Sequence, residues 1–399
     1  MYQRMFKIKG IVQHYSWGGF EFIPQLLGID NKEQKPFAEY WLGTHPNHPA
    51  VIENSEQKLS AFVHQNPEVL GKEAMKKFSS LPFLFKILDV RQMLSVQVHP
   101  GKESAALEFA KENEKGIALT APHRNYKDEN HKPELMVALS DFWLLHGFKK
   151  EDVLKQTLQA RPELQFLLSV FDKGGYKDLY EEVMHMDQQK VNEILHPLVE
   201  KIIPLYNNNE LRRDSEDFWA ARAAINFCKD NNYDRGIFSI YLFNLVHLKK
   251  GEGIFQPQGM PHAYLEGQNV EVMANSDNVL RAGLTDKHID VAELMKHVAF
   301  EATLPDILNP AAAQHRVFIS PASEFELHQY QIEETIENIA SQSAEIWFLL
   351  SGSATLEDNG EQLHLQKGEA FFLAADTNVF MRSSSASLFR VIVPNVTKN

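Results

Sequence analysis

A stretch of helical periodicity interrupts a chain whose other parts show the pattern of short strands. Within residues 149–233, Val191, Ile194, Leu195 and Leu198 recur at intervals of three and four and form one apolar stripe. On both sides, short apolar runs such as LPFLFKILDV and EIWFLLSGSATL are separated by Pro, Gly and Asn clusters that favour turns. The sequence therefore predicts a mainly β protein with an all-helical insertion.

This pattern also predicts how the chain divides into domains. We expect residues 1–148 and 234–310 to form one discontinuous catalytic β domain, because the helical insertion at 149–233 separates two strand-rich segments. Strand signals resume at residue 234, with alternating apolar and polar residues in IFSIYLFNLVHL, and residues 311–399 form a second β domain. A length of 399 residues suits several domains.

Two turns in the β segments share one local spacing. The first contains Gly251, Pro257, Gly259 and His262, in the order and spacing of the second signature motif of the cupin barrels. In the last segment Gly368 stands in the corresponding place, while Ala374, Asp376 and Val379 replace the proline, the second glycine and the histidine. The chain therefore resembles two cupin-type jelly-roll β-barrels plus an all-helical domain, and the second barrel lacks metal ligands.

Charge and cysteine content exclude several classes of partner. The formal net charge of −13 repels polyanions, so we expect no nucleic-acid partner and no membrane partner. Cys228 is the single cysteine, which excludes a disulfide framework within the chain and favours a reducing compartment. The sequence has neither the apolar core of a signal peptide nor a membrane-length apolar run, so we expect a cytoplasmic protein. We also expect a monomer.

Four polar residues have the chemistry of a metal site. In LSVQVHPGK, Gln97 and His99 are two apart and face the same side of a strand, with valines on the other side. Glu134 follows a proline at the mouth of the apolar strand LMVALS, and His262 ends the cupin-like motif. Two nitrogen and two oxygen ligands suit one divalent ion, zinc first and manganese or iron second. Each segment alone also fits a hydrogen-bonded strand pair or a solvated carboxylate.

Longer segments carry a resemblance to a known family. YKDENHKPE at 126–134 and HAYLEGQNVEVMANSDNVLRAGLTDK at 262–287 resemble the two signature segments of the type I mannose-6-phosphate isomerases, which are zinc-dependent. IVQHYSWGG, FAEYWLGTHP and LSVQVHP extend the similarity over most of the chain. One departure is Asp286, which stands where many members have proline before the lysine.

The resemblance implies a reaction and a set of site residues. The reaction is the interconversion of D-mannose 6-phosphate and D-fructose 6-phosphate, a small phosphorylated sugar, through an enediol. The residues implied are Gln97, His99, Glu134 and His262 as ligands of one Zn²⁺; Arg281 as the residue most associated with catalysis; Lys132, Glu271, Asp277 and Lys287 in the same pocket; and Ser95 and Lys102 near the phosphate. The base stays open, with Asp277 and Glu271 ranked above Lys132.

Other functions compete with this one. A cupin metal-dependent oxygenase, or an isomerase of another phosphorylated aldose, would use a related metal site. A non-catalytic sugar-binding cupin would bind without turnover. The chain has no GxxxxGK[ST] loop and no GxGxxG segment, which argues against an ATP-dependent kinase or a nicotinamide dehydrogenase.

Overall fold

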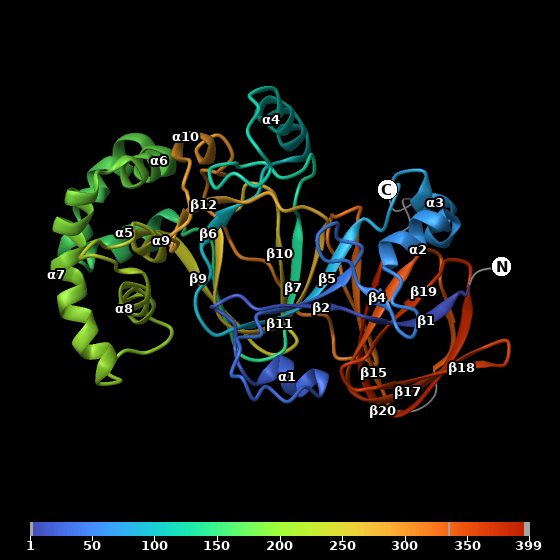
Figure 1. The fold of residues 1–399 in the computed structure, drawn as a ribbon. Helices are drawn as coiled ribbons and strands as arrows, with labels where there is room; N and C mark the ends of the chain where they lie inside the picture. The colour runs from blue at the N-terminus through green and yellow to red at the C-terminus, as the bar shows by residue number, and fades with distance from the viewer. Residues whose placement is uncertain (1–2, 334–335, 395–399) are drawn as a thin grey trace.

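Two sheets and a group of helices form an elongated molecule (Figure 1). The structure is a computed structural model that describes residues 3–333 and 336–394. Helices α5 to α9 lie at one end, the first sheet lies in the middle, and the second sheet lies at the other end. Within the described residues, no helix is both long and apolar enough to cross a membrane.

The first sheet has eleven strands and holds five of the polar residues singled out above, namely Gln97, Glu134, His262, Glu271 and Arg281. Its main path runs β13-β10-β7-β11-β5-β3-β2, with β6, β8, β9 and β12 attached through β11 and β8. The strands are β2 (Ile11–Gln13), β3 (Glu39–Gly43), β5 (Phe83–Val90), β6 (Val96–Val98), β7 (Glu134–Ala138), β8 (Phe142–Phe148), β9 (Phe243–Leu248), β10 (Gly253–Gln256), β11 (His262–Ala274), β12 (Leu280–Gly283) and β13 (Ile307–Leu308). The long strand β11 pairs with β5 and β7 along one part and with β6 and β8 at its start.

The second sheet contains strands from both ends of the chain. Its main path runs β14-β15-β20-β17-β19-β1-β4, and β16 and β18 attach to β20 and β17. The strands are β1 (Met5–Lys9), β4 (Val51–Ile52), β14 (His315–Phe318), β15 (Glu326–Ile332), β16 (Ile336–Ala340), β17 (Glu345–Asp358), β18 (Glu361–Gln366), β19 (Ala370–Leu373) and β20 (Asn378–Ile392). In the described residues neither sheet closes into a complete barrel.

Two N-terminal strands pair outside the first sheet. Within residues 1–148, where we expect part of the catalytic domain, β1 and β4 belong to the second sheet, and Met5 lies opposite Leu373. The cause is apolar packing, because the ring of Phe6 stacks on Phe372 at 5.2 Å and meets the edge of Phe62 at 4.9 Å.

The helical segment begins where the sequence predicts and ends later. It comprises α5 (Glu151–Gln159), α6 (Phe166–His185), α7 (Gln188–Asn207), α8 (Glu216–Phe227) and α9 (Gly236–Leu242). The predicted stripe of α7 is buried, and Ser215 caps α8 by accepting a hydrogen bond from the backbone N–H of Asp217. The strand predicted from residue 234 is wrong over α9. Every residue of α9 is buried, so no polar face reveals its helical period.

Short helices complete the fold around the sheets. They are α1 (Phe22–Leu27), α2 (Leu59–Gln65), α3 (Lys72–Met75), α4 (Lys102–Glu114) and α10 (Val291–Leu294). The helical segment packs on the first sheet through a common core that includes Val96 and Val98 of β6. Gln97, between these valines, lines a cleft instead, which confirms the predicted alternation of this strand.

The two cupin-like turns have the same backbone conformation. Gly251 and Gly368 have φ of 89° and 86°. Gly259 has φ of 77°, and Asp376, which replaces it in the second turn, keeps a left-handed φ of 56°. At the last position of the motif, His262 and Val379 are both fully buried.

Candidate metal centre and active site

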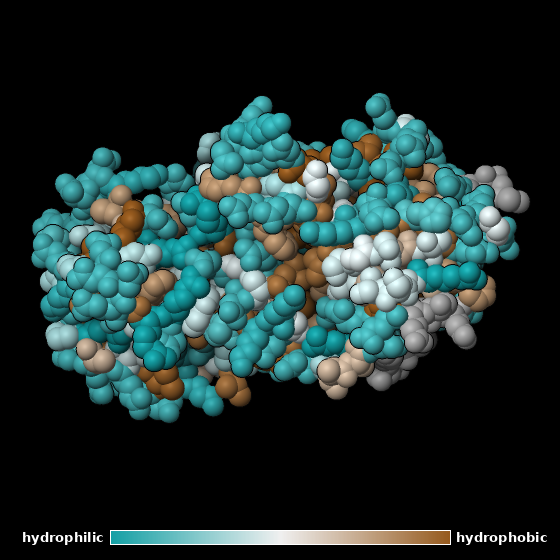
Figure 2. Space-filling view, turned by 90° about the horizontal axis from the view of Figure 1, so that it is seen from below, coloured by the Kyte–Doolittle hydropathy of each residue, from teal (hydrophilic) through white to brown (hydrophobic). Residues whose placement is uncertain are grey.

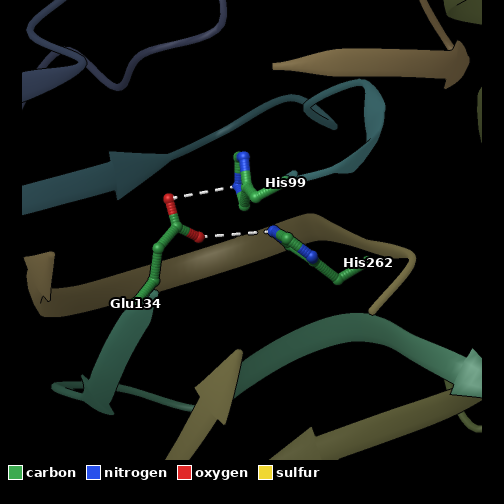
Figure 3. Close-up of side chains that lie close together, drawn as sticks. All are labelled: His99, Glu134 and His262. Atoms are coloured by element: carbon green, nitrogen blue, oxygen red, sulfur yellow. Dashed lines mark ion pairs between the residues drawn. The ribbon is translucent and has the colours of Figure 1, made fainter. Parts of the chain in front are cut away.

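Three ligand-type side chains converge inside the first sheet. His99, Glu134 and His262 offer one ligand atom each, and these atoms lie within 4.8 Å of one another (Figure 3). Nε2 of His99 is 3.5 Å from Oε1 of Glu134, and Nε2 of His262 is 3.3 Å from Oε2 of the same carboxylate. All three residues are buried.

Strand pairing explains why residues so distant in sequence meet. His262 begins β11 and lies opposite Gln97 of β6, and His99 follows that strand directly. Glu134 begins β7 and lies opposite Met273 on β11. The sheet therefore fixes the backbone beneath each of these side chains.

Both imidazoles are oriented by a hydrogen bond from the ring nitrogen that faces away from the cluster. Nδ1 of His99 donates to the carbonyl of Asn278 at 2.8 Å, and Nδ1 of His262 donates to the carbonyl of Met260 at 2.9 Å. Each Nε2 then carries a lone pair directed at the other ligand atoms. Among the described residues, neither Nε2 nor Oε2 of Glu134 has a hydrogen-bond partner. Buried polar atoms are rarely left unpaired, so this arrangement fits a divalent cation.

Burial and a nearby cation set the protonation of this group. Burial lowers the pKa of His99 to about 4, which keeps the imidazole neutral, the form that binds a metal. Burial alone would raise the pKa of Glu134. Lys132, whose Nζ lies 3.0 Å from Oε1, and His99 outweigh that effect, so the pKa of Glu134 is well below its ordinary value.

A second buried charge pair lies on the neighbouring strands. Nζ of Lys86 is 3.1 Å from Oε1 of Glu271, and the hydroxyl of Tyr264 donates to Oε2 at 2.7 Å. Burial raises the pKa of Glu271, whereas for Lys86 three carboxylates, led by Glu271, outweigh burial and raise the pKa. Sequence analysis missed Lys86. The available signal was a single lysine inside the apolar run FLFKILDV, in which all eight residues prove to be buried.

Asp277 belongs neither to the metal group nor to the Lys86–Glu271 pair, and two residues of the N-terminal segment hold it in place. Nε2 of His45 lies 3.2 Å from Oδ1, and the amide of Asn47 donates to Oδ2 at 3.3 Å. Although burial acts in the opposite direction, the hydrogen bond and charge of His45 lower the pKa of Asp277, so it is a carboxylate at neutral pH. Its side chain remains 37% exposed, in contrast to 3% for Glu271.

A cleft of about 380 Å³ provides room for a sugar-sized ligand. Gln97, Ser95, Arg281 and Lys287 line it, as do Tyr15 and residues at the end of α8. Burial lowers the pKa of the Arg281 guanidinium, and no described carboxylate forms an ion pair with it. A half-buried, unpaired guanidinium is suited to binding an anion.

Lys102 lies apart from these residues. It begins α4, is exposed, and does not line the cleft. Its charge instead acts on Glu324, in the segment before β15.

Comparison with known proteins identifies the family. The family model for the phosphomannose isomerase type I catalytic domain matches residues 5–151, and that for the mannose-6-phosphate isomerase cupin domain matches residues 314–393. The mannose-6-phosphate isomerase of Escherichia coli (strain K12) is 35% identical over 97% of this chain and 99% of its own length. The chain belongs to the type I phosphomannose isomerases.

The similarity extends to a mammalian sequence and to a solved structure. The mannose-6-phosphate isomerase of Homo sapiens is 31% identical over 95% of this chain and 95% of its own length. A crystal structure of the Salmonella typhimurium enzyme, bound to its substrate fructose 6-phosphate and to zinc, has a TM-score of 0.88 and 34% identity. That match covers 98% of this chain and 100% of the other.

Proposed function

We propose that this phosphomannose isomerase interconverts D-mannose 6-phosphate and D-fructose 6-phosphate with one Zn²⁺ per chain. The carrying observation is the buried group of His99, Glu134 and His262, whose inward-facing atoms lack hydrogen-bond partners, beside a cleft that holds an unpaired arginine. An oxygenase would account for the metal group, but it would not require the unpaired arginine in the cleft.

His99, Glu134 and His262 would hold the zinc, with the side-chain oxygen of Gln97 as a fourth ligand. The support for Gln97 is its place opposite His262 and its exposure to the cleft. Bound zinc would supply a Lewis acid that polarises the sugar carbonyl and stabilises the negative charge developing on oxygen.

Isomerisation moves one proton between C2 and C1. For the base we propose Asp277, because it is ionised and accessible, while both oxygens of Glu271 are engaged and Lys132 is paired with Glu134. Its carboxylate would take the proton from C2 of the aldose, and O1 would gain a proton as the enediol forms. Return of the first proton to C1, together with loss of the proton from O2, would then yield the ketose, so the proton that O2 releases balances the one that O1 gained.

Arg281 would stabilise the charge that develops on the substrate oxygens, since its guanidinium stays protonated. Ser95 and Lys287, in the same cleft, would bind the phosphate and hold the sugar in register. Lys102 does not line the cleft, so we leave it out of the phosphate site.

A coupled spectrophotometric assay of mannose 6-phosphate conversion tests the proposal. Activity should disappear on chelation and return with zinc, and Arg281→Ala should lower kcat/KM by roughly 100-fold or more, a loss typical of removing a charge-stabilising donor. A folded, zinc-loaded chain without turnover would contradict the assignment.

We also propose that the two sheets are cupin-type jelly rolls, supported by their equivalent turns. The proposed domains are residues 1–148 and 234–310, 149–233, and 311–399, with β1 and β4 transferred to the last. We further propose that the chain acts as a monomer in the cytoplasm, without nucleic-acid or membrane partners. Size-exclusion chromatography with light scattering would test the oligomeric state.

A further inference from the structure

We propose that a cavity between the two sheets is a second anion site, which binds a small phosphorylated polyol. The cavity measures about 360 Å³, enough for a molecule the size of a hexose phosphate. It lies against α1, which is on the lower side of the molecule in Figure 1. Figure 2 views the molecule from that side and shows hydrophobic residues exposed near the middle of the face. None of the cavity's lining residues lines the catalytic cleft.

The two sheets contribute equivalent residues to this cavity. Lys250 and Lys367 each precede the glycine of a cupin-like turn, and both line the cavity. The N–H of Gly251 donates to the carbonyl of Ala138 at 2.8 Å, and the N–H of Gly368 donates to that of Leu349 at 2.8 Å. The two turns therefore meet around one cavity in related environments.

The acidic residue of each turn faces the turn itself. Glu252 accepts a hydrogen bond from the backbone N–H of Lys249 at 2.8 Å, and Glu369 accepts one from that of Gln366 at 2.8 Å. Glu369 also forms an ion pair with Lys7. Neither carboxylate lines the cavity, and the two exposed lysines at its wall form no ion pair with them.

Two cationic side chains, Lys250 and Lys367, line the cavity, and a third, Arg316, contacts the turn beside it; no described Asp or Glu lines the cavity. Within the described residues, Lys250 and Lys367 form no ion pair or hydrogen bond through their side chains. Arg316 donates to the carbonyl of Gly251 at 2.9 Å and to Oε1 of Gln329 at 3.2 Å, which are neutral acceptors, and its buried Nε has no partner. In a chain of net charge −13, this concentration of unpaired positive charge favours a bound anion.

The remaining lining residues define the class of ligand. Gln25, Gln331 and Ser387 offer amide and hydroxyl groups, and Gln331 donates to the hydroxyl of Ser387 at 2.9 Å. Phe22 and Leu350 add an apolar wall. Cations for a phosphate, short polar groups for hydroxyls and an apolar surface for a carbon chain together match a phosphorylated polyol.

Isothermal titration calorimetry of the zinc-loaded full chain with D-glucitol 6-phosphate tests this site. The probe has no carbonyl group, so the isomerase cannot convert it. We expect one site in the catalytic cleft and one in the cavity. Lys250→Gln/Lys367→Gln should weaken the second site by roughly 100-fold, because it removes two charge-assisted contacts. Lys249→Gln, an exposed lysine that does not line the cavity, is the matched control.

The decisive comparison is between the number and affinity of the binding sites in the wild type and in the double variant. Loss of one site, with unchanged isomerase kinetics and thermal stability, supports the proposal. Equal numbers of sites and equal affinities in the two proteins would overturn it. If the cleft itself failed to bind, the wild type would show one site and the double variant none, so failure of the proposed function remains distinguishable.

Discussion

Two buried histidines lie opposite each other on neighbouring strands, and one of them belongs to the ligand group. His262 pairs with His146 across β11 and β8. Nδ1 of His146 lies 2.7 Å from Oε1 of Gln256, and burial lowers the pKa of His146 to about 4. Of these two histidines, only His262 directs its unpaired Nε2 at Glu134.

We expect His262→Asn to abolish stoichiometric zinc binding, since it leaves only part of the ligand set. Zinc affinity should fall at least 100-fold, a loss larger than the 10- to 100-fold typical of outer-shell changes. His146→Asn is the matched control, because it alters a buried histidine on the partner strand. Metal analysis after dialysis checks both variants, and retention of one zinc by His262→Asn would exclude it as a ligand.

The Lys86 and Glu271 pair supports a prediction about stability. Lys86→Met should lower the free energy of unfolding by about 3–5 kcal/mol, because it leaves the buried carboxylate without its cation. Lys86→Met/Glu271→Gln should recover much of that loss, since no uncompensated charge remains. Urea unfolding monitored by circular dichroism measures both effects. Additive losses in the double variant would show that the two side chains do not stabilise each other.

Residues near one another in sequence could be found from the sequence, and those joined only by the fold could not. Gln97 lies in a strand that His99 follows directly, and Glu134 follows a recognisable proline. Lys86 and His45 can be recognised as site residues only from their contacts with Glu271 and Asp277. The fold brings those partners to them from far along the chain. No local pattern encodes such a pairing.

At the scale of elements, α10 shows how a short helix is held in place. Glu293 accepts a hydrogen bond from the hydroxyl of Tyr126 at 2.7 Å and pairs with Lys296 at 2.6 Å. Hydrogen bonding from His297, with these two contacts, lowers the pKa of Glu293 to about 2. The carboxylate therefore fastens α10 to the loop that leads to Glu134.

This anchor predicts a pH-dependent contribution to stability. The folded pKa lies below the ordinary value of 4.5, so the contribution is fully present above pH 4.5 and is lost as pH falls towards about 2. Allowing for partial exposure, Glu293→Gln should cost about 1–2 kcal/mol at pH 7. Thermal melts of both proteins from pH 2 to pH 7 should converge at the acidic end, and a constant gap would contradict the prediction.

Amphipathic helices were predictable, while a helix buried on every side was not. The stripe of α7 and the cap of α8 appear in the sequence as spacing and as a serine at the helix start. The helix α9 has no polar face, so its apolar run was read as a strand. Burial on all sides is a property of the assembled molecule, which explains the error.

At the scale of the whole molecule, one ion pair joins the second β unit to the loop of the metal centre. Nε2 of His131 lies 2.8 Å from Oε1 of Glu324, which is only 3% exposed. His131 belongs to the same loop as Lys132 and Glu134. The C-terminal unit thus supports the position of the active-site loop, and its own motif carries Val379 where the first motif carries His262.

We expect Glu324→Ala to lower kcat by roughly 3- to 30-fold with zinc content unchanged, because the loop loses an anchor worth about 1–2 kcal/mol. Glu324→Asp should restore part of the rate, since it keeps the charge. Steady-state kinetics with metal analysis measures both variants. Full activity in Glu324→Ala would show that the loop holds its position without this contact.

The pairing of β1 with β19 governs the order in which this protein can fold during translation. Met5 is translated about 370 residues before its partner Leu373. At about 5–20 residues per second, the N-terminal strand waits roughly 20–70 s for that partner. Until then the edge of β1 that pairs with β19, and the face of Phe6 that stacks on Phe372, are uncovered and available to a chaperone, and a prematurely terminated chain could not complete its second sheet.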